Sequence, residues 1–523
     1  MGADPSVAVE GLHWIDNAII LVYMVGVFVL GSYFGKYVNT AEDFFSSGKT
    51  LPWWAIGMSI VVTDISATDF IATAGAGYVY GISAANFDLI GSMPAMVFSA
   101  FIFVPYYWRS GVFSIPEFLG RRYNSAVQII HGTIWGVFLL VMMSVMLWLT
   151  AITLQTIVGW NPYVSTWAIV LITGLYTLSG GLTAVVMTDV VQMFVMFVGG
   201  IALLCLSMWE VGGWSGLQEK IHALGPQYAD HFTMLLPHDT TTPYPWTGII
   251  FGLGLVMATG YMCGNPTIVQ RALGAQSEWD AKGGMLFAGL LKVFIPLMII
   301  VPGLAAVVLV PGLENGDQAV PSMIRDLLPP GLKGLMFAAL FAALMSSVSS
   351  YLNTATTIWT TDLYGKIRYL ITGKSIPDRQ ILAIGRYFTI AFMFIAAIFA
   401  PYLADQKTMY NFIQTSLSMF QGPVFAILLL GILWRRANRW GGLAGMLLGV
   451  AFTTILTLTD GVFRSSEPFL FVAWWSFVFS IVVTVVVSLL TPPEPEEKIR
   501  GLVFGQVLKD GEIQRVLRGR ISE

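Results

Sequence analysis

Long apolar segments, separated by short polar ones, follow one another along almost the whole chain. A membrane-spanning helix needs about 20 apolar residues, and on that basis the chain holds about 13 candidate spans. Their centres lie near residues 24, 62, 96, 142, 172, 198, 256, 296, 346, 391, 423, 450 and 481. The pattern predicts an all-α polytopic membrane protein without separate soluble domains.

The composition and the distribution of charge agree with this prediction. The chain is 56% hydrophobic and 11% charged, whereas a soluble domain carries roughly a quarter charged residues. Basic residues gather in alternate loops, as at Arg121 and Arg122 or Arg435 and Arg436, and the intervening loops are neutral or acidic. The positive-inside rule then places the N-terminus outside and the C-terminus in the cytoplasm of a multi-pass protein of the cell membrane. An odd number of spans requires the same arrangement.

Two of the predicted spans are interrupted in the middle. The second contains Thr63–Ser66, whose short polar side chains compete with the helix backbone, and the seventh contains Thr259–Pro266, where glycine and proline weaken the helix. Glycine and proline are common in membrane helices anyway. Interrupted helices at corresponding positions are nevertheless the best sequence pointer to an inverted-repeat transporter.

The resulting division of the chain has six parts. These are an N-terminal segment with the first span (1–51), a five-helix repeat (52–209), an extracellular loop (210–244), an inverted five-helix repeat (245–436), two C-terminal spans (437–491) and a cytoplasmic tail (492–523).

Polar clusters inside apolar spans point to the chemistry. The second span carries Asp64 and Asp69, and a later span carries four serines between Ser346 and Ser350. Charged and hydroxyl groups are costly at membrane depth and are a functional signal there. Two such clusters predict a paired site for an ion and a solute.

One segment gives a specific resemblance. Residues 176–192 read Tyr-Thr-x-x-Gly-Gly-Leu-x-Ala and then Thr-Asp-x-x-Gln, with Gly180 and Gly181 expected to form a tight cytoplasmic turn. This pattern resembles the signature of the sodium/solute symporter family, and the chain is most similar to its sodium/sugar branch over about residues 15–460. Supporting matches are Ile115–Phe118, Val269–Arg271, Phe337–Leu340, Ser346–Ser347 and Thr361–Tyr364.

The resemblance implies a LeuT-type fold, with two inverted five-helix repeats, one helix before them and about two after them. It also implies a sodium site made by the backbone carbonyls of Val62, Ile65 and Ala343 with the hydroxyls of Ser346 and Ser347. The last three residues stand at i, i+3 and i+4, on one helix face. The alternative is that a serine-rich helix only packs closely against its neighbour.

The same resemblance suggests a second sodium ion, held by Asp189 with Ser346, Ser349 and Ser350. The alternative for Asp189 is a cytoplasmic gate carboxylate that pairs with a basic residue. We therefore expect one sodium ion or two.

The solute site follows from the sugar branch. Asp88 stands where that branch carries glutamate, and further predicted contacts come from Asp64, Ser66, Asp69, Phe87, Tyr261, Lys292 and Gln414. A lysine within an apolar span needs a partner, so Lys292 has a structural ion pair with Asp64 or Asp88 as its alternative. Gln414 has a helix–helix hydrogen bond as its alternative.

Three positions depart from the sugar branch. Asp64 replaces a common asparagine, Asp69 replaces glutamine or histidine, and Ala258 replaces asparagine. The extra carboxylates are suited to the hydroxyls of a polyol, but they are equally suited to an amino or quaternary ammonium group, or to a proton.

The predicted function is sodium-coupled import of a small polar solute, with a sugar or polyol favoured, by alternating access. A different solute (amino acid, carboxylate or quaternary amine) and a non-transporting membrane sensor are the alternatives. We find no triad, no metal-ligand spacing of the five histidines and two cysteines, and no repeated filter loops. Neither an enzyme nor a channel is therefore predicted, and the expected partners are sodium ions, the solute and membrane lipids, without nucleic acid.

Overall fold

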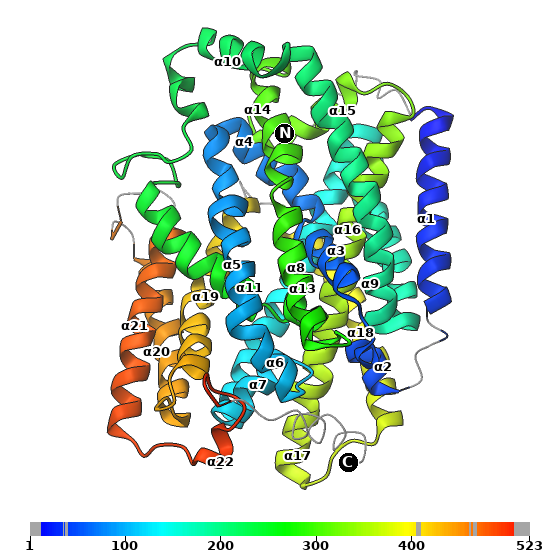
Figure 1. Cartoon of the computed structure of the whole chain (residues 1–523). Coiled ribbons are helices and arrows are strands. Elements are labelled where there is room, and N and C mark those ends of the chain that lie inside the picture. Colours follow the sequence, from blue (N-terminus) through cyan, green and yellow to red (C-terminus); the bar gives the residue numbers. More distant parts are fainter. Residues whose placement is uncertain are drawn as a thin grey trace.

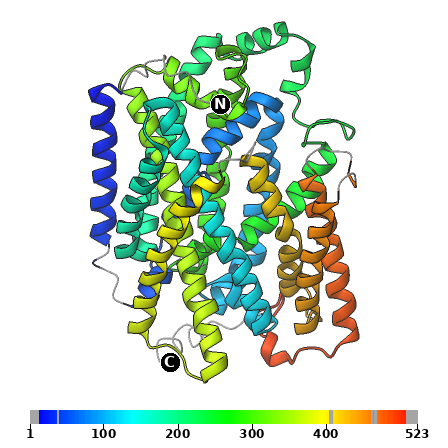
Figure 2. The ribbon, with the colours of Figure 1, turned by 180° about the vertical axis from the view of Figure 1, so that it is seen from behind.

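The computed structural model describes residues 12–34, 36, 40–403, 409–459, 462–463 and 468–506. Within these ranges the chain is helical, apart from connecting segments and two isolated bridges, Leu51–Ala275 and Leu236–Pro245. The axes of most long helices are roughly parallel or antiparallel to one another (Figures 1 and 2). The predicted all-helical, multi-span class is confirmed.

The long helices are α1 (Trp14–Phe34), α3 (Trp53–Asp64), α8 (Ser125–Val158), α9 (Pro162–Val211), α13 (Glu278–Lys292), α14 (Ile295–Leu309), α16 (Leu332–Thr357), α18 (Asp378–Phe399), α19 (Met409–Leu433), α20 (Arg439–Leu458) and α21 (Phe469–Leu490). The shorter ones are α2 (Ala41–Ser46), α4 (Ala74–Tyr80), α5 (Met93–Phe98), α6 (Val104–Ser110), α7 (Ile115–Arg122), α10 (Gly213–Ala223), α11 (Thr259–Gly264), α12 (Pro266–Leu273), α15 (Ala319–Leu327), α17 (Lys366–Thr372) and α22 (Glu496–Ile499). Tighter or wider helical turns are η2 (Ser47–Lys49), η3 (Asp69–Thr73), η4 (Gly81–Ala85), η5 (Phe87–Ser92), η6 (Ser99–Phe103), η7 (Pro226–Phe232), η8 (Gly248–Ala258), η9 (Gly316–Gln318), η10 (Ile358–Gly365) and η11 (Ala400–Leu403).

By length and composition, ten helices in the described residues are long and apolar enough to cross a membrane, or 12 if each of two bent pairs counts as one span. The remaining predicted centre, near residue 172, falls on a shorter apolar helix, Pro162–Leu175. This helix is the first part of α9. The two parts of α9 are joined across a kink at Gly181, where φ is 52° and ψ is −155°. A Cβ atom at Gly181 would lie 2.6 Å from the carbonyl oxygen of Phe44, so the turn requires glycine for both its conformation and its close packing.

Both predicted interruptions are present. The chain bends by 62° between α3 and the helical run Asp69–Ala85, and by 48° between the run Gly248–Gly264 and α12. At the first break the Ser66 N–H donates to the Asp69 carboxylate at 2.8 Å. At the second, Pro266 has no N–H, and the Asn265 side chain accepts from the Thr267 N–H at 2.8 Å. In each case a short polar side chain replaces the backbone bond that a continuous helix would have made.

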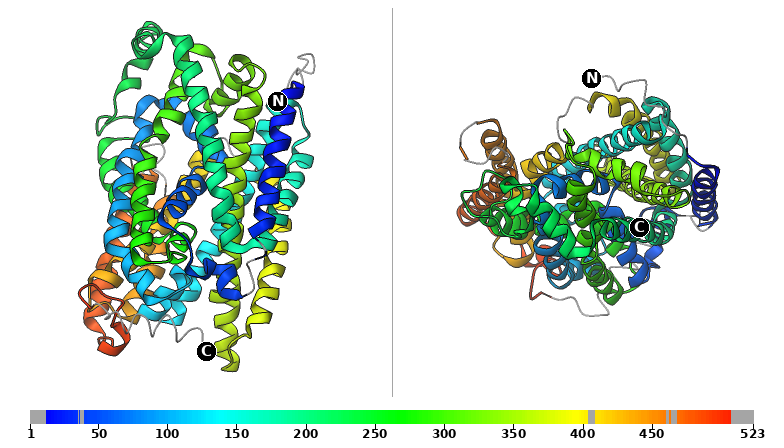
Figure 3. Two further views of the ribbon diagram at one scale, coloured as in Figure 1. Left: turned by 45° about the vertical axis from the view of Figure 1, so that its right-hand side comes forward. Right: turned by 90° about the horizontal axis from the view of Figure 1, so that it is seen from above.

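The helices differ strongly in how far their neighbours enclose them. The span that contains α16 is 94% buried over its most apolar window, whereas α1 is 17% buried. Seen from above, α1 stands at one edge of the molecule, and α20 and α21 stand at the other (Figures 1 and 3). The helix α16 therefore lies in the interior.

Candidate functional site

A cavity of about 150 Å³ lies beside the break after α3. All eight residues predicted to contact the solute line it, namely Asp64, Ser66, Asp69, Phe87, Asp88, Tyr261, Lys292 and Gln414. The other lining residues are Thr68, Thr73, Ser92, Phe138, Met142, Met146, Leu253, Met257, Ala258, Met262, Tyr351, Ile413 and Leu417. The fold thus gathers these residues from both halves of the chain around one space.

Lys292 is the last residue of α13 and is only 4% exposed. Its Nζ donates to Asp88 Oδ1 at 2.7 Å and also pairs with Asp64. The ion pair that the sequence leaves open for Lys292 is therefore present with both carboxylates. Because the three residues belong to α13, α3 and η5, this one ammonium group ties three elements together at the cavity wall.

Asp69 is held differently. Its Oδ2 accepts from the Ser66 N–H at 2.8 Å and from the Ser66 hydroxyl at 3.0 Å, and its Oδ1 accepts from Thr73 at 3.2 Å. No lysine, arginine or histidine of the described ranges forms an ion pair with it. Asp69 closes the unwound turn and lies beside the cavity.

Part of the cavity lining is apolar. Met142 and Met146 stand one turn apart on α8, and Phe138 lies one turn before Met142. Tyr261 lies on α11, with its ring centroid 6.4 Å from that of Trp135. A solute here meets both hydrogen-bonding groups and sulfur, aromatic and aliphatic groups. The methionines carried no specific signal in the sequence, since methionines in apolar spans are ordinary core residues.

Two of the five predicted sodium residues, Ala343 and Ser347, lie where α16 passes the end of α3, whereas the Ser346 hydroxyl donates to Asp189 at 2.6 Å. Ser347 Oγ lies 3.0 Å from the carbonyl oxygen of Thr63 and 3.0 Å from that of Ala343. The Ser66 N–H, which would bond the Val62 carbonyl in a continuous helix, donates to Asp69 instead. Unwound carbonyls and hydroxyls are hard oxygen donors of the kind that bind sodium ions in transporters.

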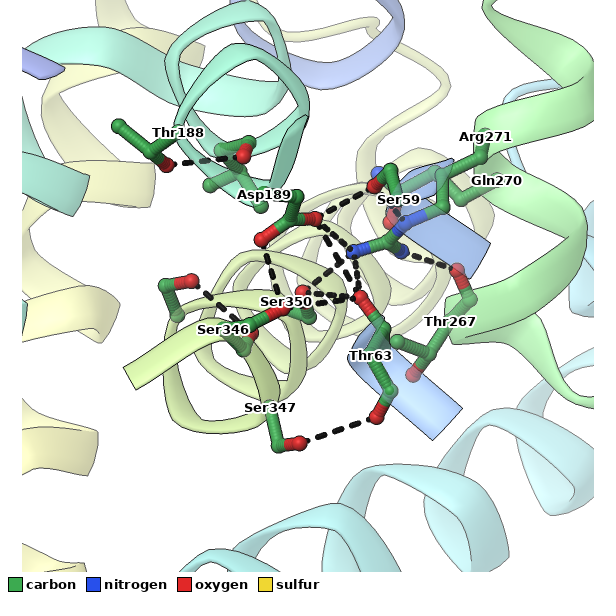
Figure 4. Close-up of polar contacts among 12 residues, drawn as sticks. Ser59, Thr63, Thr188, Asp189, Thr267, Gln270, Arg271, Ser346, Ser347 and Ser350 are labelled. Atoms are coloured by element: carbon green, nitrogen blue, oxygen red, sulfur yellow. Dashed lines mark hydrogen bonds and ion pairs between the residues drawn. The ribbon is translucent and has the colours of Figure 1, made fainter. Parts of the chain in front are cut away.

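Asp189 lies on the α9 segment that follows Gly181 and is fully buried. Its Oδ1 accepts from Ser346 at 2.6 Å, and its Oδ2 accepts from Ser59 at 2.5 Å and from Arg271 Nη2 at 3.2 Å (Figure 4). Asp189 thus has the basic partner that the gate interpretation expects.

Arg271 on α12 reaches several of the same groups and is also fully buried. It donates to Ser59 at 2.6 Å, to Thr63 at 2.7 Å and to the Thr267 carbonyl at 2.5 Å, and it contacts Ser350 (Figure 4). The sequence marked Arg271 only as part of the Val269–Arg271 match. Its role was missed because its partners are up to 212 positions away.

The four residues predicted for a second sodium ion are not equivalent. Ser346 and Ser350 both join the cluster around Asp189 and Arg271. Ser349 instead donates to the Ser346 carbonyl of its own helix at 3.0 Å. The structure therefore brings three of the four together, with a guanidinium group among them.

Comparison with known proteins decides the family. A model of the sodium:solute symporter family matches residues 44–449. The chain belongs to this family. It is therefore a multi-pass sodium-coupled solute symporter and not an enzyme, and the resemblance carried by residues 176–192 is confirmed.

Two named relatives of this symporter carry sugars or polyols. The chain is 31% identical over 510 residues to the sodium/glucose cotransporter of Vibrio parahaemolyticus, with 92% of this chain and 91% of the relative covered. It is 31% identical over 548 residues to the human sodium/myo-inositol cotransporter, with 94% and 75% covered.

Solved structures show the same fold. A Na⁺-coupled sialic acid symporter, in a substrate-bound outward-open state, matches with a TM-score of 0.81 at 22% identity, covering 92% of this chain and 99% of that one. A transporter of the nucleobase-cation-symport-1 family matches with a TM-score of 0.58 at 13% identity, covering 87% and 97%. The predicted LeuT-type fold of this symporter is thereby confirmed.

Proposed function

We propose that this symporter imports a sugar or polyol together with sodium by alternating access, and that the cavity beside Asp64 and Asp69 is the solute site. The observation that carries the proposal is the mixed polar and apolar lining of the cavity. Carboxylate oxygens and the Gln414 amide suit hydroxyl groups, and aromatic faces such as Tyr261 suit the apolar face of a sugar ring. The glucose and myo-inositol carriers among its relatives support the same class.

The charges of the cavity narrow the choice of solute. Three carboxylates, Asp64, Asp69 and Asp88, face one ammonium group, Lys292. A carboxylate is an acceptor only, so the site favours solutes rich in donors. A solute that carries its own carboxylate would meet like charge, which makes the acidic alternative the least favoured one.

For the coupling ion, we propose the carbonyls of Val62, Ile65 and Ala343 with the hydroxyls of Ser346 and Ser347. An ion at this place would join the end of α3 to α16, because the Ser347 hydroxyl already lies against the Thr63 carbonyl. Sodium drives transport only if it prefers one conformation over the other, since equal affinity for both would shift nothing. An ion that bridges a broken helix and an intact one meets that condition when the two move apart.

For the orientation, we propose an extracellular N-terminus and a cytoplasmic C-terminus. The helices α7, α17 and α22 lie at one end of the molecule, and α10 lies at the other (Figure 1). The first group includes the basic residues Arg121, Arg122, Lys366 and Arg368, which the positive-inside rule assigns to the cytoplasm.

The test is uptake by proteoliposomes with an inward sodium gradient, and with potassium in place of sodium as the control. The panel pairs glucose with glucuronate and includes myo-inositol, sorbitol, alanine and choline. We expect sodium-dependent uptake of at least one hexose or polyol and none of glucuronate. Glucuronate uptake would refute the proposed solute class, and sodium-dependent binding of a solute without any flux would favour the sensor.

A further inference from the structure

The formal charges of the groups that line the cavity do not sum to zero. Lys292 pairs with both Asp64 and Asp88, and Asp69 has no ion pair within the described ranges. The proposed sodium ligands are carbonyls and hydroxyls, which carry no charge, so a bound sodium ion adds one positive charge nearby. Counted as formal charges, with all three carboxylates ionised, one lysine and one sodium ion leave a single negative charge.

The free hydrogen-bonding capacity lies on the same carboxylate. An ionised carboxylate has about four lone-pair sites, and Asp69 uses three of them for the Ser66 N–H, the Ser66 hydroxyl and Thr73. Asp69 also lines the cavity. One acceptor position of an unpaired carboxylate is therefore left to a solute.

We propose that Asp69 is a specificity-determining residue that receives a protonated amine, and that the preferred solute is an amino sugar or amino polyol. A neutral sugar would satisfy the acceptor position with a hydroxyl and leave the charge unbalanced. A primary ammonium group satisfies both, because it donates a charge-assisted hydrogen bond and supplies the missing positive charge. The methionine and aromatic side chains that line the cavity would then contact the carbon skeleton of the solute.

This inference rests on the proposed function, since it takes the cavity to be a sugar or polyol site. The experiment measures the sodium-driven uptake of the hexose or polyol that the proteoliposome assay identifies. Glucosamine, N-acetylglucosamine and glucose are compared as competitors of this uptake, at a pH that keeps the amine of glucosamine protonated. Acetylation removes the charge and keeps the ring, and glucose lacks the nitrogen. We expect glucosamine to compete at a concentration at least tenfold lower than either neutral sugar.

Two variants test whether Asp69 causes the preference for glucosamine. Asp69→Asn should remove the advantage of glucosamine over glucose and over N-acetylglucosamine. Asp88→Asn removes a carboxylate from the same cavity that already pairs with Lys292, and it should keep the advantage. Because Asp69 also closes the unwound turn, the wild-type comparison stands on its own if Asp69→Asn does not fold.

The outcomes separate the two proposals. Uptake of glucose without any preference for glucosamine overturns the role of Asp69 and leaves the sugar assignment intact. A preference that survives Asp69→Asn also overturns it. Failure of all three sugars to compete overturns the role of Asp69, and it overturns the sugar or polyol assignment as well if no hexose or polyol shows sodium-dependent uptake.

Discussion

Lys292 and Arg271 are two buried cations in the membrane-spanning part of this symporter, and their surroundings differ. Lys292 faces the cavity and pairs with two carboxylates, whereas Arg271 lies in a closed cluster with Asp189 and three hydroxyl groups. A buried charge without a partner is very costly, so each side chain depends on its neighbours and they depend on it. This mutual dependence gives both cations testable roles.

Replacing Lys292 with methionine leaves Asp64 and Asp88 facing each other without a cation. We expect the solute concentration for half-maximal uptake to rise more than the sodium concentration, because both carboxylates line the solute cavity. Lys292→Arg keeps the charge and is the matched control. A change confined to sodium affinity would show that Lys292 acts on the ion site instead.

Ser347→Ala removes a hydroxyl proposed to hold the sodium ion. Loss of one ligand worth about 1.4 kcal/mol corresponds to about a tenfold higher sodium requirement. Uptake measured against sodium concentration checks the shift. Ser349→Ala is the control, since that hydroxyl donates within its own helix, and an unchanged sodium requirement in Ser347→Ala would refute the site.

At the scale of elements, each of the two broken helices contributes side chains to the Asp189–Arg271 cluster. Ser59 and Thr63 come from α3 and Arg271 from α12, whereas Asp189 comes from α9 and Ser350 from α16. The cluster therefore ties the two broken helices to two intact ones. Alternating access arises when one group of helices moves against another, so we expect this cluster to hold one side of the transporter closed.

Arg271→Gln should open that side. Removing one partner of a buried ion pair costs about 3–5 kcal/mol, so we expect lower thermal stability and freer access from the cytoplasm. Cys263, on α11 next to the second break, is buried and forms no disulfide, and Cys205 is the other cysteine of the chain. In a Cys205→Ser background, Cys263 should be alkylated faster in Arg271→Gln than in the protein with Arg271.

The double variant Asp189→Asn with Arg271→Gln separates the two effects. It removes both charges, so stability should recover while alkylation of Cys263 stays fast. Slow alkylation in both variants would mean that the cluster does not hold this side closed.

At the scale of the whole molecule, the charge pattern predicts one orientation. A single cysteine placed at exposed Gln227, in η7, should react with an impermeant reagent added to intact cells. A cysteine at Lys498 on α22 should react only after the membrane is opened. The reverse pattern would invert the proposed topology and the direction of transport.

The sequence by itself determined the membrane class and the positions of the two breaks. These features are local: apolar length sets the spans, and polar residues, glycine and proline interrupt them within a few positions. The family pattern at residues 176–192 then supplied the fold. All eight predicted solute residues line one cavity because the pattern already carried their spatial relation.

The tertiary structure alone decided how the charges are paired. Asp64 and Lys292 are 228 positions apart in the sequence, and Asp189 and Arg271 are separated by 82. Whether a buried lysine is free or paired depends on distances between helices, and one chain's residue order does not contain them. For the same reason only the structure distinguished Asp69, the cavity carboxylate without an ion pair among the described residues, from Asp64 and Asp88.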